Sequence, residues 1–214
     1  MSYQLLLGDC LDVMRGMADK SVDAVITDPP YGVGLTYGDY EDSSDNYFAL
    51  CAAFMPEAIR VSRMFVALTP GMKHLNWWYA NFPPSWTLAW VKSNQCSPSP
   101  FGGFNAWEPM LFWGKSRIRQ DALAMPIMTN QKDTGNHPCP KDINGWKRLI
   151  HLLDGDDAVK SILDPFMGSG TTGVACIKSS RSFIGIEIDP AYHAIAQRRI
   201  EDAAAQPMLF EVTA

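Results

Sequence analysis

The residues best suited to chemistry lie in two short stretches, far apart in the chain. The first is Asp28-Pro29-Pro30-Tyr31, the proline corner, which sets a carboxylate and an aromatic ring on either side of two prolines. The second is the glycine turn, residues 168–173, with the spacing Gly-x-Gly-x-x-Gly. A carboxylate and a ring offer a ligand an acceptor and a stacking face, and glycines let the backbone approach a ligand closely. Both stretches are therefore predicted to contact ligands.

The proline corner follows a segment that is expected to be a buried strand. Residues 22–27 are short, largely apolar and rich in β-branched side chains. Two consecutive prolines supply no backbone N–H, so the chain must leave the sheet stiffly at this point. Asp28 and Tyr31 then stand at the carboxyl end of a strand, where open α/β sheets bind ligands. Taken alone, the same four residues also fit an ordinary turn.

The glycine turn also joins a strand to a helix. The strand is expected over 161–163, ending at Asp164, and the helix is expected to continue to Lys178. Glu187 lies at the end of the next strand, where an acid can bind the hydroxyl pair of a ribose. The pattern predicts a nucleoside-containing cofactor, and by itself it suits NAD equally well.

Strands and helices alternate along the chain, which predicts an α/β domain with a parallel sheet. Further strands are expected at 3–7, 64–68, 86–91 and 108–113, and helices at 47–61, 72–80, 142–153 and 190–205. Loops are expected at 32–46 and 97–105, and an irregular segment at 116–136. Only one strand and one helix follow the glycine turn, so the other strands must come from the N-terminal part. That order makes the sheet circularly permuted and argues against an ordinary dehydrogenase.

The composition limits the class of protein. A chain of 214 residues with 47% apolar residues suits one folded domain. It has no membrane-length apolar run and no signal peptide at its start, so we expect a cytoplasmic protein. The five cysteines are scattered without a Cys-x-x-Cys pair, and His137 has no partner cluster, so no disulfide or metal site is expected. A net charge of -5 argues against strong nonspecific binding to nucleic acids.

The combination of the two motifs resembles the DNA amino-methyltransferases. The second motif reads Asp164-Pro165-Phe166-Met167-Gly168-Ser169-Gly170-Thr171-Thr172. Enzymes of this family transfer a methyl group from S-adenosylmethionine to the exocyclic amino nitrogen of adenine or cytosine. With the proline corner first and the glycine motif last, the chain resembles the permuted β subgroup. The resemblance covers nearly the whole chain and implies a single Rossmann-like catalytic domain over residues 1–214, with helices on both faces of a mostly parallel sheet.

The resemblance also implies which residues act. The expected catalytic residues are Asp28, Pro29, Pro30 and Tyr31: the acid and the Pro29 carbonyl accept hydrogen bonds from the amino group, and Tyr31 stacks on a base flipped out of the duplex. The expected cofactor contacts are Asp9, Cys10, Asp28, Asp164, Pro165, Phe166, Gly168, Gly170, Thr171, Thr172 and Glu187. For Asp9, the residues themselves leave a helix cap as an equal alternative.

Target recognition is expected in the short segment 116–136, where Arg117, Arg119 and Lys132 are the candidate contacts to double-stranded DNA. Its length predicts a short recognition sequence or help from a second subunit in a homodimer. N6 of adenine is the expected target, in the manner of restriction–modification enzymes, with N4 of cytosine as the alternative. Two alternative functions belong to other classes of protein: an NAD-dependent oxidoreductase, and a catalytically silent relative that binds nucleic acids.

The C-terminal tail, residues 206–214, carries a separate pattern. Gln206, Leu209 and Phe210 match the peptide by which many bacterial replication proteins hold the sliding clamp. The favoured alternative is that the apolar residues of the tail dock on the protein's own core.

Overall fold

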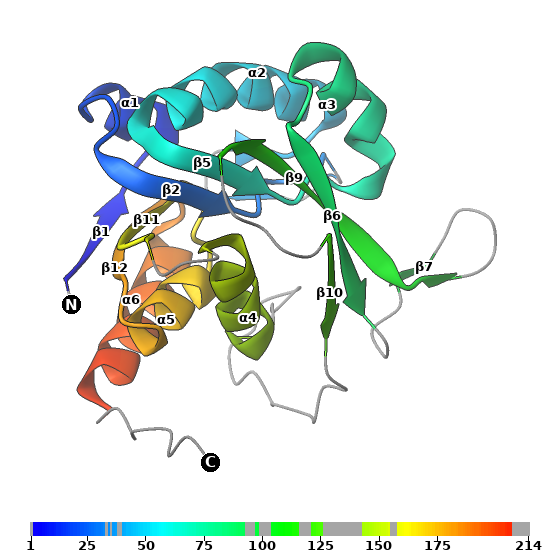
Figure 1. Ribbon diagram of the computed structural model, residues 1–214. Coiled ribbons are helices and arrows are strands. Elements are labelled where there is room, and N and C mark those ends of the chain that lie inside the picture. The colour runs from blue at the N-terminus through cyan, green and yellow to red at the C-terminus, as the bar shows by residue number, and fades with distance from the viewer. Residues whose placement is uncertain are drawn as a thin grey trace.

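An eight-stranded sheet forms the centre of the protein in the computed structural model (Figure 1). The structure describes residues 2–32, 34, 36–37, 40–92, 97–98, 104–115, 121–125, 143–154 and 158–206. The strands of the sheet are β1 (Tyr3–Leu7), β2 (Val22–Thr27), β5 (Ser62–Leu68), β6 (Trp86–Lys92), β9 (Trp107–Gly114), β10 (Ala122–Met125), β11 (Ser161–Asp164) and β12 (Ser182–Glu187). Their order across the sheet is β1-β12-β11-β2-β5-β9-β6-β10.

All neighbouring strands pair in parallel except β9, which runs antiparallel to both β5 and β6. The expected α/β class with a mostly parallel sheet is confirmed. The uniform alternation of strand and helix fails between β6 and β9, because a small hairpin and not a helix joins them within the described residues. Antiparallel neighbours need no helical crossover, so this departure is consistent with strand geometry.

The segments expected to be loops contain short strands. The hairpin of β3 (Thr36–Tyr37) and β4 (Tyr40–Glu41) lies in the segment 32–46, and that of β7 (Ser97–Pro98) and β8 (Phe104–Asn105) lies in 97–105. β10 lies in 116–136, the segment expected to be irregular. Two to four residues are too few to show a period in sequence, so pairing with a neighbour decides these strands.

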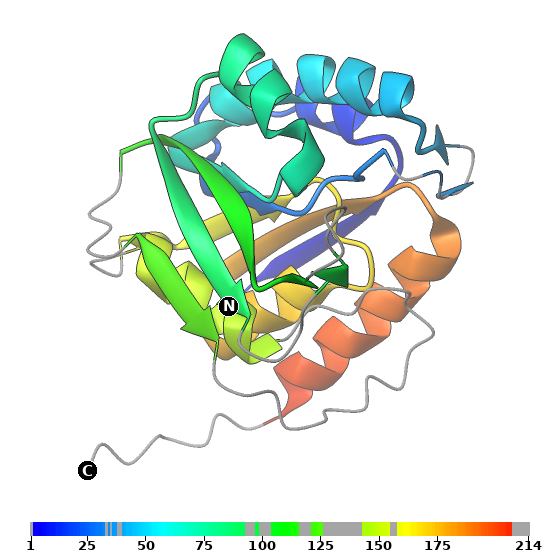
Figure 2. The same cartoon turned by 90° about the vertical axis from the view of Figure 1, so that its right-hand side faces the viewer.

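Helices cover both faces of the sheet, as expected (Figures 1 and 2). One face carries α1 (Cys10–Arg15), α2 (Ser44–Val61) and α3 (Leu75–Asn81), which follows the 3-10 turn η1 (Met72–His74). The other carries α4 (Ile143–Asp154), α5 (Thr171–Lys178) and α6 (Pro190–Ala205). Each layer buries its own apolar cluster, with Tyr47, Phe54 and Trp78 in the first and Trp146, Phe183 and Ile200 in the second. Among the described helices, none is long and apolar enough to cross a membrane.

The two C-terminal strands occupy the interior of the sheet. β11 and β12 lie between β1 and β2, so the first strand of the chain ends up at the edge. The carboxyl ends of four consecutive parallel neighbours, β1, β12, β11 and β2, therefore lie along one side of the sheet. Each of the predicted ligand-binding motifs follows one of these ends.

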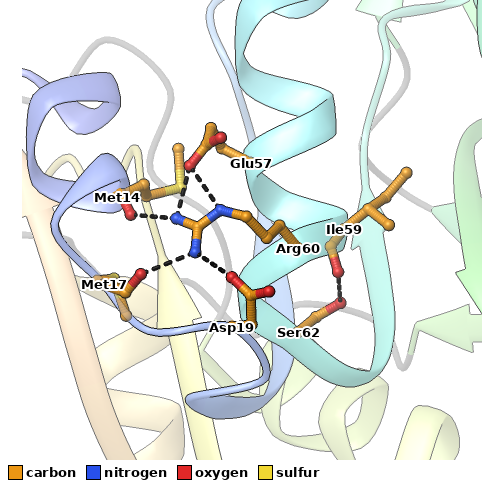
Figure 3. A network of polar contacts seen from close by, with 7 residues as sticks. All are labelled: Met14, Met17, Asp19, Glu57, Ile59, Arg60 and Ser62. Carbon is orange, nitrogen blue, oxygen red and sulfur yellow. Dashed lines mark hydrogen bonds and ion pairs between the residues drawn. The ribbon is translucent and has the colours of Figure 1, made fainter.

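A network around Arg60 lies between α1 and α2, next to the segment that leads into β2 (Figure 3). From the end of α2, the Arg60 guanidinium donates to the carbonyl oxygens of Met14 at 2.7 Å and Met17 at 2.8 Å. It also forms ion pairs at 2.7 Å with Asp19 and Glu57. Arg60 therefore joins the end of α2 to the end of α1 and to the segment that follows α1.

Candidate active site

The proline corner brings three hydroxyl and carboxyl groups together. The hydroxyls of Tyr31 and Thr69 each donate a hydrogen bond to Asp28 Oδ1, and the two hydroxyl oxygens lie 3.0 Å apart. Asp28 follows β2, and Thr69 follows the neighbouring strand β5. The structure therefore unites Asp28 and Tyr31 and adds Thr69, which is 2% exposed. Sequence reasoning missed Thr69, although its position just before the Pro70-Gly71 break at the end of a strand was an available signal.

A glycine on the neighbouring loop gives room to the Tyr31 ring. A Cβ atom on Gly71 would lie 3.2 Å from Tyr31 Cδ1, and Gly71 has φ +71°, a conformation that glycine adopts readily. The loop after β5 thus contacts both the hydroxyl of Tyr31, through Thr69, and its ring, through Gly71. The ring is held beside Asp28 rather than directed away from it.

The glycine turn uses its three glycines for two different purposes. Gly168 and Gly170 have φ values of +51° and +82°, in the left-handed region, and the second of them directly precedes α5. Gly173 lies inside the helix, where an added Cβ would lie 2.4 Å from Ile200 Cδ1 and 2.7 Å from Phe183 Cε1. The first two glycines shape the turn at the helix N-terminus, whereas the third allows α5 to pack closely on α6 and β12.

Asp164 connects the glycine turn to the proline corner. Its Oδ1 accepts a hydrogen bond from Thr27 Oγ1 at 2.6 Å and one from the Phe166 backbone N–H at 3.1 Å. Burial raises the pKa of Asp164 to about 6, against hydrogen bonds from Thr172 and Thr27 that lower it, and the negative charge of Asp28 raises it further.

Glu187 lies beside the glycine turn. Its Oε2 accepts a hydrogen bond from Gly168 N, and its Oε1 accepts one from Asp189 N, both at 2.9 Å. Burial raises its pKa, which these backbone hydrogen bonds oppose. Its backbone carbonyl accepts a hydrogen bond from Gly8 N at 2.9 Å, so the turn after β1 is attached to the end of β12.

The turn after β1 carries Asp9 and Cys10. Asp9 is the N-cap of α1, because its Oδ1 accepts hydrogen bonds from Leu11 N at 2.7 Å and Asp12 N at 3.3 Å. This geometry matches the helix-cap alternative, while a contact with a cofactor stays a prediction. Cys10 is buried, and burial, together with the charge of Asp9, raises the pKa of its thiol to about 12. The group is therefore a neutral thiol at physiological pH.

Other predicted sites lie wholly or partly outside the described residues. Arg117, Arg119, Lys132 and His137 are not among them, and neither are Leu209 and Phe210 of the tail. Gln206 is the last described residue and is exposed. Over the described ranges, no group of three or more His, Cys, Asp or Glu side chains is placed to hold a metal ion.

The arrangement suits chemistry between two ligands. Glu187 and the glycine turn place a carboxylate beside the N-terminus of α5, and these groups suit a nucleoside. The proline corner, on the adjacent strand, offers the acceptors of Asp28 and the Pro29 carbonyl to a group that carries N–H bonds. Because the ends of β11 and β2 are neighbours, the two ligands would meet.

Other proteins are similar in sequence to this chain over most of its length. A family model for DNA methylases of the N6/N4 type matches residues 103–198. The YubD protein of Escherichia coli (strain K12) is 29% identical over 208 residues, covering 92% of this chain and 89% of its own length. The type II methyltransferase M2.MboI of Moraxella bovis is 26% identical over 249 residues, covering 94% of this chain and 88% of its own.

Solved structures share its fold. The cytosine-N4-specific PvuII DNA methyltransferase has a TM-score of 0.71 at 18% identity, over 95% of this chain and 92% of that chain. The M1.HpyAVI–SAM complex has a TM-score of 0.67 at 22% identity, over 92% of this chain and 98% of that chain. The family model, the relatives and the two motifs all point to the DNA amino-methyltransferases as the proteins that this chain resembles.

Proposed function

We propose that this protein transfers a methyl group from S-adenosylmethionine to the N6 amino group of adenine in double-stranded DNA. The observation that best supports the proposal is a hydrogen bond between the two strand ends from which the motifs begin. Thr27, the residue before Asp28, donates a hydrogen bond of 2.6 Å to Asp164, which begins the glycine motif. The acceptor for the amino group and the turn for the cofactor are thus held at adjacent strand ends.

The side chains near the glycine turn fit S-adenosylmethionine. The left-handed glycines, Gly168 and Gly170, present backbone at the start of α5, and the carboxylate of Glu187 is suited to ribose hydroxyls. Asp164, Pro165, Phe166, Thr171 and Thr172 surround the turn, and Asp9 and Cys10 follow the neighbouring strand β1. When bound, the cofactor supplies an electrophilic methyl group on its sulfonium.

The proline corner acts on the amino nitrogen of the target base. This nitrogen is a poor nucleophile because its lone pair is delocalised into the ring. Asp28 accepts a hydrogen bond from one N–H group of the amino nitrogen, and the Pro29 carbonyl accepts one from the other. These contacts favour a pyramidal nitrogen whose lone pair is free to attack the methyl group. Tyr31 stacks on the flipped base. The residues act by positioning and by stabilising the developing positive charge, without a covalent intermediate.

The strand order supports the assignment to the permuted subgroup. β2, which carries the proline corner, precedes β11 and β12 in sequence, yet the latter two lie between β1 and β2 in the sheet. This is the arrangement that results when the cofactor-binding strands are moved to the C-terminal end of the chain.

The test is methylation of DNA purified from cells that lack methyltransferases. The reacted DNA is digested to nucleosides and analysed by mass spectrometry. We expect N6-methyladenine from the parent protein and none from Asp28→Ala. N4-methylcytosine would support the second candidate instead, which is favoured by the likeness to the cytosine-N4-specific PvuII enzyme. A parent protein that forms neither product on any DNA would overturn the proposal.

A binding measurement separates the methyltransferase from an oxidoreductase. A ligand that binds only the native state raises its melting temperature, by an amount that grows with concentration. We expect S-adenosylhomocysteine to raise the melting temperature and NAD to leave it unchanged. The reverse result would favour a dehydrogenase.

A further inference from the structure

The backbone just after the prolines is held almost entirely by side chains from other segments. Asp42 accepts hydrogen bonds from Tyr31 N at 3.3 Å and Gly32 N at 2.7 Å. On the carbonyl side, His74 Nε2 lies 2.9 Å from Tyr31 O, and Lys73 Nζ donates to Gly32 O at 2.8 Å. All four polar backbone atoms of two consecutive residues therefore have side-chain partners.

Asp42 and His74 make these contacts from buried positions. Asp42 is 0% exposed and His74 is 5% exposed. Burying a carboxylate is unfavourable unless hydrogen bonds compensate, and two of those that Asp42 receives come from this turn. Its own backbone carbonyl accepts a hydrogen bond from Gly34 N at 2.8 Å, so Tyr31, Gly32 and Gly34 are all attached to Asp42.

The His74 ring is fixed by its neighbours. It stacks on the ring of Tyr47 with 4.3 Å between centroids. The Tyr47 hydroxyl in turn donates to Pro70 O and accepts from Trp78 Nε1, both at 2.8 Å. Burial lowers the pKa of His74, helped by the charge of Lys73 and opposed by Tyr31 O and Asp42, so the ring is neutral at physiological pH. A neutral ring with its proton on Nε2 is the donor that the carbonyl of Tyr31 needs.

We propose that Asp42 and His74 are positioning residues for methyl transfer, which act by holding the Tyr31 backbone so that its ring stays beside Asp28. The inference rests on the proposed function, because it assigns the two residues to the same reaction. The Tyr31 ring extends from this backbone, so contacts that hold the backbone also hold its hydroxyl beside Asp28 and Thr69. An anchored ring costs less entropy to order when a base stacks on it.

The first test observes Tyr31 directly and needs no catalysis. 3-Fluorotyrosine is introduced at position 31, and its 19F NMR resonance is recorded with S-adenosylhomocysteine present. We expect Asp42→Asn to shift or broaden this resonance. Asp45→Asn, which removes the same charge from a nearby exposed position in α2, should leave it unchanged. A resonance that is the same in Asp42→Asn and in the parent protein overturns the proposal.

The second test asks whether Asp42 acts through Tyr31. In the parent background we expect Asp42→Asn to lower kcat about tenfold, the size expected for one weakened charge-assisted hydrogen bond, with KM for S-adenosylmethionine little changed. In a Tyr31→Ala background the same change should have an effect below about twofold, because residues that act through one another are not additive. Equal effects in both backgrounds would contradict the proposal.

His74 provides a second variant in case Asp42→Asn folds poorly. His74→Gln keeps a side-chain N–H donor and should retain most of the activity and the 19F resonance. His74→Leu removes the donor and should lose both. Identical behaviour of the two variants would overturn the role of His74. If the parent protein methylates no DNA, the proposed function fails, while the 19F spectra still decide whether these residues position Tyr31.

Discussion

Thr27 Oγ1 donates a hydrogen bond of 2.6 Å to Asp164 Oδ1, and this contact joins residues that are 137 positions apart in the chain. Thr27 ends β2 directly before the proline corner, and Asp164 ends β11 and begins the motif that contains the glycine turn. Both side chains are buried, with Thr27 0% and Asp164 2% exposed. A buried hydrogen bond of this kind holds two strand ends in register, so it sets the distance between the acceptor of the amino group and the turn for the cofactor.

Removing this hydroxyl should weaken both the fold and cofactor binding. Thr27→Val keeps the shape but leaves Asp164 with one donor fewer, and we expect a loss of about 1–3 kcal/mol in the free energy of unfolding. Urea denaturation measures the loss, and calorimetry measures the affinity for S-adenosylhomocysteine. Thr27→Ser, which keeps the hydroxyl, is the matched control and should lose less of both. Equal losses in the two variants would mean that the hydroxyl has no special role.

Asp164 should make the stability depend on pH. Burial raises its pKa from the ordinary value of 3.8 to about 6 in the folded protein, so the folded state binds more protons than the unfolded state between these values. This group's contribution is fully present below pH 3.8 and is lost as the pH rises through about 6. We expect the free energy of unfolding of Asp164→Asn to decline less than that of the parent protein between pH 4 and 7. Parallel curves for the two proteins would refute the shift.

The third glycine of the glycine turn should tolerate no side chain. Gly173→Ala would place its Cβ 2.4 Å from Ile200 Cδ1, and overpacking of this kind costs about 1–3 kcal/mol. The control is Gly16→Ala, whose Cβ would have its nearest neighbour at 3.4 Å. Thermal unfolding should show a lower melting temperature for the first variant and little change for the second. A Gly173→Ala protein as stable as the parent would show that α6 can move away.

Arg117 and Arg119 are expected to contact phosphates of the DNA. Replacing both with Gln should weaken binding to all sequences alike and lower the slope of log K against log salt concentration by roughly 2, about 0.9 for each lost contact. Fluorescence anisotropy with a labelled duplex at several salt concentrations measures the slope. An unaltered slope would remove these residues from the interface.

The amino-acid sequence by itself determined the features that depend on neighbouring residues in the chain. Two prolines stop β2 because they lack N–H groups, and the spacing of glycines marks a turn into α5. The two motifs and their order were therefore readable, and with them the fold class. Asp9 could be read as a cap because capping involves the next few residues only.

The tertiary structure decided everything that depends on distant segments meeting. Thr69, Asp42 and His74 lie within 46 positions of Asp28, yet no local pattern connects them to it, because their contacts arise only when β5, α2 and η1 pack around the corner. The antiparallel direction of β9 and the strand β10 were decided in the same way, by pairing across the sheet. Hydrogen bonds between strands and the packing of side chains act through space. For this reason the sequence predicted the chemical groups of the proline corner but not the residues that hold them in place.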